Sequence, residues 1–212
     1  MIDGLVAVPD ALADLLPEKG IRRGSTLSVE SPCGGCSLVL ALLAEVTGGG
    51  AWAAAVGLPS LGLVAAAEMG VELRRLALVP EPGERWPAVV AALLDGFDLI
   101  VLRPPGRARA ADARRLAARV RERGAVMVLL DDPLWPETPD VRLAVKRSVW
   151  EGLGNSYGRL LSRRVEVVAG GRRLAGRERR RWLWLPGAGG AVLPLEAAVD
   201  EVDGGTGERA VV

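Results

Sequence analysis

The chain has 212 residues, half of them apolar and a quarter charged, with a formal net charge of +1. This mixture is typical of a soluble globular domain, and no apolar run reaches the ~18 residues that would span a bilayer. The absence of histidine excludes Ser–His and Cys–His nucleophilic dyads and His-ligated metals. The first residues carry Asp3 and Asp10 without a basic region, so we expect no signal peptide and a cytoplasmic protein.

Apolar runs alternate with helical patterns along the first two thirds of the chain, which predicts an α/β domain with a mainly parallel sheet. The expected strands are residues 25–30, 51–58, 73–81, 97–103 and 124–130, and the expected helices are residues 37–46, 61–70, 85–96 and 109–123. The strand over 97–103 is continuously apolar, as buried parallel strands are.

After about residue 140 the pattern changes to an apolar–polar alternation with period two, which predicts antiparallel strands over 141–150, 162–170 and 179–186. Trp182 and Trp184 fall on one face of the last strand, where we expect them to fill the core. We predict one domain over residues 1–194. The acidic, Gly-rich segment 195–212 is predicted to be a disordered tail.

The two cysteines of the chain lie in "SPCGGCS", between the first expected strand and its helix. One interpretation is a thioredoxin-type redox pair, in which the helix N-terminus lowers the pKa of Cys33. The many parallel units, the lack of a flanking aromatic residue and the lack of a Pro-containing substrate loop oppose it. We expect instead a buried, reduced pair.

The same position in another α/β fold is a phosphate-binding loop, G-x-x-x-x-G-K-[ST]. Gly35 and Ser37 match that template, and Gly34 with Gly35 keeps its turn. Glu30 replaces the first glycine and would place a carboxylate near the phosphates if it points inward. Cys36 replaces the lysine, and a thiol cannot supply its cation.

The run "LLPEKGIRRGSTLSVESPCGGCSLVLALLAEVTGGGAWAAAVGL" resembles the opening of the RecA-type recombinase core, and the resemblance covers about residues 11–185. It implies a RecA-like fold. "FDLIVLR" falls where that family has its Walker B acid, but this strand ends in Arg103. Pro59 or Ser60 stands where the family has its catalytic Glu. The resemblance therefore implies a pseudo-ATPase that uses no cofactor.

The segment "GLPSLGLVAAAEMGVELRRLALVPEPGERWPAVVAALLDG" resembles the actinobacterial ImuA-prime family of a mutagenesis cassette. The resemblance implies a non-catalytic subunit in DNA-damage-induced translesion synthesis. Its partners would be an ImuB-like adaptor polymerase, an error-prone replicative-type polymerase and possibly RecA. The connections after the fourth and fifth strands are short, so we expect weak or absent direct DNA binding. A SulA-like cell-division inhibitor and a nucleotide-binding RecA-like ATPase are the alternatives.

The expected helix 109–123 carries a surface that could meet an acidic partner or DNA phosphates. Residues 103–124 hold eight arginines against two acids, which makes this stretch strongly basic. We expect Leu116 and Val120 in the core, since they lie on a separate stripe of the helix. The expected partner surface consists of Arg107, Arg114, Arg115, Arg119 and Arg123.

Overall fold

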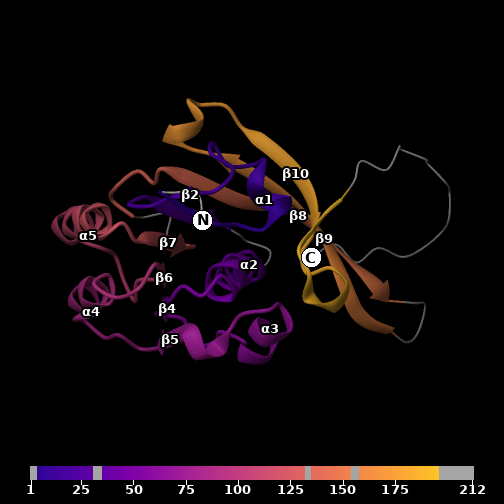
Figure 1. Cartoon of the computed structure of the whole chain (residues 1–212), viewed down its shortest axis with the longest axis horizontal. Coiled ribbons are helices and arrows are strands. Elements are labelled where there is room, and N and C mark those ends of the chain that lie inside the picture. The colour runs from indigo at the N-terminus through magenta and orange to yellow at the C-terminus, as the bar shows by residue number, and fades with distance from the viewer. Residues whose placement is uncertain (1–3, 31–34, 132–134, 154–157, 196–212) are drawn as a thin grey trace.

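The structure is a computed structural model and describes residues 4–30, 35–131, 135–153 and 158–195. Its main feature is a nine-stranded sheet with the order β11-β10-β9-β8-β3-β7-β6-β4-β5 (Figure 1). No helix in these ranges is long and apolar enough to cross a membrane. The fold is therefore mixed α/β with a large, mostly parallel sheet, as the sequence predicts.

The parallel part of the sheet consists of six strands, because each of them is parallel to its neighbours in this half. They are β3 (Thr26–Glu30), β4 (Ala53–Val56), β5 (Leu76–Val79), β6 (Leu99–Leu102), β7 (Val126–Leu130) and β8 (Val141–Leu153). β6 and β7 are buried at every position. Continuous burial explains why their sequences are apolar throughout rather than alternating.

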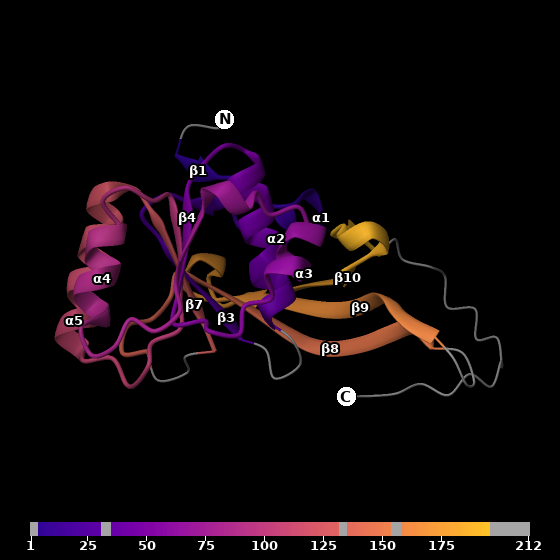
Figure 2. The ribbon, with the colours of Figure 1, turned by 90° about the horizontal axis from the view of Figure 1, so that it is seen from below.

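Helices cover both faces of the parallel strands (Figure 2). They are α2 (Gly35–Gly48), α3 (Leu63–Glu68), α4 (Trp86–Leu93) and α5 (Ala110–Arg123). α2 and α3 lie on one face, where α2 packs in one hydrophobic cluster with Leu27 and Val29 of β3. α4 and α5 lie on the other face, and Leu116 and Val120 of α5 are fully buried in a second cluster there. The prediction that Leu116 and Val120 are core residues is confirmed.

The antiparallel part consists of β9 (Gly158–Gly170), β10 (Arg179–Trp184) and β11 (Leu193–Pro194), joined to the parallel part by β8. The prediction that the strand from residue 141 is antiparallel is wrong on one side. β8 is antiparallel to β9 but parallel to β3, with Leu27 opposite Val141. Alternation along the chain reports which residues are buried and carries no information about strand direction, so it could not reveal this parallel pairing.

The two tryptophans of β10 do not fill the core, so this prediction is wrong. Leu183 between them is fully buried. Because successive side chains of a strand point to opposite faces, Trp182 and Trp184 lie on the other face, where both are partly exposed. Arg164 of β9 stacks over the Trp184 ring at 5.9 Å from its centroid.

Several short elements were not predicted from the sequence. Among them are β1 (Leu5–Val6) and β2 (Ile21–Arg22), which form a separate two-stranded sheet, and α1 (Asp10–Ala13). The predicted strand 73–81 begins instead with a 3-10 turn, η1 (Leu73–Arg75), in which the Arg74 N–H donates to the Glu72 side chain. The remaining short turns are η2 (Arg172–Leu174) and η3 (Ala188–Gly190). Elements of two to four residues are too short to show a hydrophobic period.

Candidate functional site

The edge of the sheet formed by the carboxyl ends of its parallel strands is the place to examine first, because open α/β sheets bind ligands there. β3, β7, β6 and β4 are consecutive neighbours and run in the same direction. The residues that follow them therefore share one edge. These include three positions singled out from the sequence, namely the loop after β3, Pro59 after β4 and Arg103 after β6.

The loop after β3 leads into α2, which begins at Gly35. Cys36 and Ser37 thus occupy the first turn of a helix, as the phosphate-loop template requires of its last two positions. The Cys36 thiol is exposed, so the expectation of a buried cysteine is wrong for this residue. Cys33 and Gly34 lie outside the described residues.

Glu30 does not point toward α2. Val29 is fully buried on the α2 face, so the alternation of the strand directs Glu30 to the opposite face. There its carboxylate forms an ion pair with Nε of Arg142 at 2.8 Å. An open polar groove of about 260 Å³ runs beside this pair, and Lys146, Arg177 and Glu178 also line it. The inward orientation that would bring the Glu30 carboxylate near phosphates is therefore not the one in the structure.

Arg103 forms the best-defined polar contact at the carboxyl edge. Its Nη2 atom lies 2.7 Å from Oδ2 of Asp131, the residue that follows β7. Both side chains are partly exposed. The pair joins the ends of two neighbouring strands and places a guanidinium where the resemblance requires a metal-binding acid. The sequence analysis did not single out Asp131. It could have done so, because Asp131 directly follows a buried apolar strand, as Arg103 does.

The loop after β4 passes close to Arg103. Gly57 has a φ of +75°, and a Cβ atom added there would lie 1.9 Å from the Arg103 carbonyl oxygen. Leu58 then turns into the core, whereas Pro59 and Ser60 are exposed. Neither of these two exposed residues has a side chain that can act as a general base at neutral pH.

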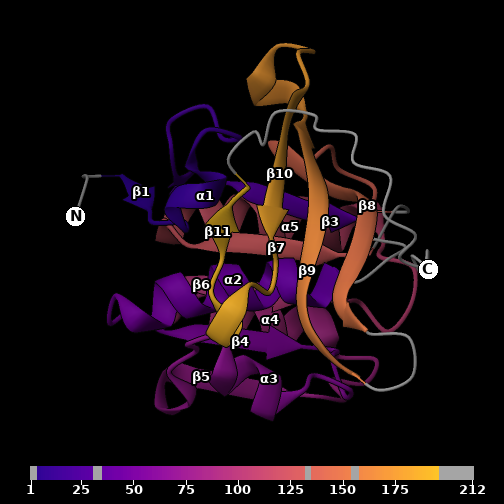
Figure 3. The ribbon, with the colours of Figure 1, turned by 90° about the vertical axis from the view of Figure 1, so that its right-hand side faces the viewer.

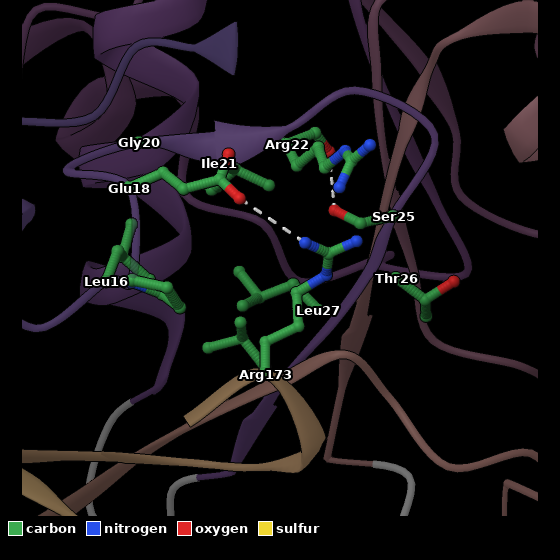
Figure 4. Close-up of a pocket in the computed structure, with 11 residues that line it drawn as sticks. Leu16, Glu18, Gly20, Ile21, Arg22, Ser25, Thr26, Leu27 and Arg173 are labelled. Carbon is green, nitrogen blue, oxygen red and sulfur yellow. Dashed lines mark hydrogen bonds and ion pairs between the residues drawn. The ribbon is translucent and has the colours of Figure 1, made fainter. Parts of the chain in front are cut away.

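A small pocket lies at the opposite, amino end of β3 (Figure 4). Its volume is about 10 Å³, which holds about one water molecule. Arg173 reaches across it and forms an ion pair with Glu18 at 3.4 Å, and the Ser25 hydroxyl donates to the Arg22 carbonyl oxygen. This space is too small for a nucleotide. Within the described ranges, no group of three or more His, Cys, Asp and Glu side chains is arranged to hold a metal ion.

Two of the five arginines expected to form a partner surface are bonded within the molecule. Arg119 donates to both carboxylate oxygens of Asp95 at 2.9 and 2.6 Å, and Arg123 contacts the same carboxylate at 3.1 Å. Hydrogen bonding from Arg119 lowers the pKa of Asp95 below its usual value, and the Asp95 carboxylate in turn raises the pKa of Arg119. These contacts join α5 to the end of α4.

The other three arginines of the expected surface remain available. Arg107, Arg114 and Arg115 are exposed, and no ion pair connects them to another residue in the part of the chain that the structure describes. The expected partner surface is therefore reduced to these three side chains. Helical periodicity predicted that these three side chains are exposed. It could not predict that Arg119 and Arg123 bind Asp95, because this contact depends on how α4 and α5 pack together.

Comparison with known proteins gives a family. The model of the MT3502 N-terminal domain family matches residues 14–137. An uncharacterized protein of Mycobacterium tuberculosis, Rv3395c, is 42% identical over 125 residues, which are 58% of this chain and 60% of that protein. The matched part contains the parallel strands β3 to β7 and the residues at their carboxyl edge. Neither name states an activity. Because the family model matches more than half of the sequence, the chain belongs to the MT3502 N-terminal domain family.

Proposed function

We propose that this protein is a non-catalytic, protein-interaction subunit in DNA-damage-induced translesion synthesis and mutagenesis. In this proposal the domain is a RecA-like pseudo-ATPase in the cytoplasm. Its partners are an ImuB-like adaptor polymerase, an error-prone replicative-type polymerase and possibly RecA. Direct DNA binding is weak or absent.

The ion pair between Arg103 and Asp131 is the observation that carries the proposal. A nucleotide-hydrolysing site needs a carboxylate near its magnesium ion and a cation near the β- and γ-phosphates. Here a guanidinium follows β6, and the carboxylate of Asp131, directly after the adjacent strand β7, already accepts from it. The position of the phosphate-loop lysine is occupied by Cys36, whose thiol cannot supply a cation.

The strand arrangement supports the RecA-like part of the proposal. The resemblance assigns the phosphate loop, the catalytic Glu and the Walker B acid to the first, second and fourth parallel strands. These strands are β3, β4 and β6, and all three end at the same edge of the sheet. The three positions that lack the family's catalytic residues therefore lie at one edge of the sheet. This is the pattern expected if an ancestral protein had one nucleotide site there and the site was lost.

The nucleotide test is calorimetry with ATP and Mg²⁺, together with a thermal-shift measurement on the same protein. We expect no heat of binding and no change in melting temperature at millimolar nucleotide. Saturable binding or ATP hydrolysis would contradict the pseudo-ATPase. The Arg103→Asp variant serves as a comparison, because it restores an acid at the Walker B position without touching the partner surface.

The partner test uses Arg114→Glu/Arg115→Glu, which reverses the charge of two exposed side chains on α5. We expect the full chain to capture the adaptor polymerase from damaged cells, and the variant to capture at least tenfold less. The matched control is Arg177→Glu/Arg180→Glu, with the same charge change on exposed residues outside α5. Damage-induced mutation frequency in a deletion strain should follow capture. Full complementation by the α5 variant would count against this surface.

A further inference from the structure

The face of the sheet opposite α2 is uncovered over β8, β9 and β10. α4 and α5 pack on this side of the sheet, but the hydrophobic cluster to which they belong contains no residue of these three strands. Figure 2 shows α4 and α5 beside β4 and β7, whereas β8, β9 and β10 extend away from both helices. Among the described residues no helix shields this face, so its side chains are available to a ligand.

The uncovered face carries a polar groove of about 260 Å³ at one end. Its floor includes Ala144 of β8 and Val168 of β9, which lie opposite each other and are buried beneath the longer side chains around them. Lys146 and Arg177 line the groove and are exposed. Neither of them forms an ion pair with another residue in the described ranges. Two positive charges are therefore available to carboxylates at this groove.

The surroundings of the groove are basic as well. Residues 171–181, which connect β9 to β10 and include the start of β10, contain six arginines and one acid. Some of these arginines contact carboxylates, but the surface keeps a net positive charge after this pairing and favours an anionic ligand. The acids in contact with them are Asp14, Glu18, Asp140 and Glu178.

Beside the groove the same face becomes aromatic and apolar. Arg180 of β10 lies opposite Val168 of the groove floor. Trp182 and Trp184 follow Arg180 with the two-residue period of a strand, so all three side chains share this face. Leu193 of β11 lies opposite Trp184 and is 46% exposed. The face thus fits a chain segment that carries both carboxylates and aliphatic side chains.

The C-terminal segment 196–212 has this composition. It lies outside the described residues, so the prediction of a disordered tail stays a prediction. Its sequence contains five acids and one arginine, and Val199 and Val202 stand between the acids. The charge and the apolar content of the segment are therefore complementary to those of the uncovered face.

The point at which this segment begins favours the same face. Leu195, the residue before it, donates its N–H to the Trp182 carbonyl at 3.0 Å. Figure 3 shows β11, β10, β9 and β8 side by side. Three strand spacings, roughly 15 Å, therefore separate the start of the segment from β8. An extended chain covers ~3.3 Å per residue, so residues 196–212 can reach the groove.

We propose that the acidic segment 196–212 binds across this uncovered face of its own domain. Its carboxylates pair with Lys146 and Arg177, and its valines contact Trp182. Because the segment is tethered beside Trp182, its effective concentration at the face is high, and weak contacts suffice to hold it. The segment thereby keeps other anions from the face until a stronger ligand displaces it.

The arginines of α5 are the other basic surface that could attract this segment. α5 packs on β6 and β7, and at least five strand spacings separate these strands from β11. The groove is nearer, so tethering favours it. The inference is independent of the proposed role in translesion synthesis, and either can fail alone.

Nuclear magnetic resonance of the ¹⁵N-labelled full chain tests the proposal. The indole signals of Trp182 and Trp184 report on the face, and the heteronuclear NOE of residues 196–212 reports on the segment. In Asp200→Asn/Glu201→Gln/Asp203→Asn we expect both indole signals to move and the NOE of the segment to fall by at least half. Lys146→Glu/Arg177→Glu should lower the NOE equally. The matched control is Arg114→Glu/Arg115→Glu, which makes the same charge change on α5 and should leave the NOE unchanged.

A charge exchange separates ion pairing from an indirect effect of the substitutions. Lys146→Glu/Arg177→Glu combined with Asp200→Lys/Glu201→Lys/Asp203→Lys should recover at least half of the lost NOE. Unchanged amide signals of α2 show that each variant folds. Failure to recover in a folded variant would overturn the proposal, as would a wild-type segment whose NOE already equals that of the variant without the acids.

The same spectra identify another occupant of the face. A segment released by the α5 variant instead of the groove variant would lie on α5. Indole signals that depend on protein concentration would assign the face to a second copy. Wild-type indole signals that respond to oligothymidine or polyglutamate as strongly as those of the variant without the acids would show an open face, which then belongs to a nucleic acid or to an acidic partner. Each of these three results would overturn the proposal.

Discussion

Two residues at the carboxyl edge show how closely the loops after neighbouring strands are packed. Gly57 combines a positive φ with a backbone approach to Arg103 that leaves no room for a Cβ atom. Arg103 N–H in turn donates to the Val56 carbonyl at 2.9 Å. The ends of β4 and β6 are therefore fixed to each other by the backbone, which also positions the Arg103 side chain against Asp131.

Gly57→Ala should destabilise the fold by about 3 kcal/mol or more, because it adds a steric clash to the cost of a positive φ. Gly50→Ala is the matched control, since Gly50 has a φ of +89° but open space around its Cβ position. That control should lose only about 1–2 kcal/mol. Urea unfolding of both variants measures the difference, and equal losses would show that the close approach is unimportant.

Asp140 connects the beginnings of β3 and β8 with η2. Its carboxylate accepts from Thr26 N–H at 3.0 Å and from Arg172 at 2.7 Å. Burial raises the pKa of Asp140, but these hydrogen bonds and the charges of Arg172 and Arg173 outweigh it, so the pKa lies below its usual value. A carboxyl whose pKa is lower in the folded protein than in the unfolded chain stabilises the fold. This stabilisation is fully present at pH values above the pKa of the unfolded chain, which is near 4, and it is lost as the pH falls through the pKa of the folded protein.

Asp140→Asn should therefore cost about 1 kcal/mol at pH 7, a small figure because its partner Arg172 is largely exposed to solvent. The difference between the variant and wild type should shrink as the pH falls below 4, since the wild-type carboxyl then becomes neutral as well. Chemical unfolding at pH 7 and pH 3 gives the comparison. A difference that stays constant with pH would mean that the ionised form makes no special contribution.

At the scale of elements, α5 separates side chains that bind within the molecule from side chains that face solvent. Leu116 and Val120 anchor it in the second hydrophobic cluster, and Arg119 and Arg123 bind Asp95. The α4–α5 ion pairs are exposed, so they orient the helices more than they stabilise them. The exposed Arg114 and Arg115 take part neither in this hydrophobic packing nor in these ion pairs.

Leu116→Ala should destabilise the protein by about 2–5 kcal/mol, because it leaves a cavity in a fully buried position. Arg115→Ala on the exposed side of the same helix should change stability by no more than about 0.5 kcal/mol. Thermal melting of the two variants checks the contrast. A comparable loss in Arg115→Ala would mean that this arginine has a structural role instead of facing a partner.

At the scale of the whole molecule, the central sheet extends beyond the segment that the family model matches. The match ends at residue 137, whereas β3 pairs with β7 on one side and with β8 on the other. β8 in turn joins the antiparallel strands. Leu143 of β8, Val165 of β9 and Leu183 of β10 belong to the same cluster as α2. The shared sequence segment thus contributes only part of one continuous sheet.

A chain cut after residue 137 should therefore lack a cooperative melting transition or precipitate, because β3 would become an exposed hydrophobic edge. Full-length protein expressed in parallel is the control. Circular dichroism melting and size-exclusion chromatography check the outcome. A fragment that melts cooperatively near the full-length temperature would show that residues 1–137 fold as an independent unit.

The sequence by itself determined the α/β class, the succession of the longer strands and helices, and the core positions of α5. Local hydrophobic periodicity records burial, and burial is what these features share. The tertiary structure alone decided that β8 runs parallel to β3, that Glu30 turns to Arg142, and that Arg119 and Arg123 bind Asp95. Each of these contacts joins segments far apart in the chain, so no local pattern encodes it. The exposure of the β5 edge is of the same kind, because only the strand order reveals which strand lacks a neighbour.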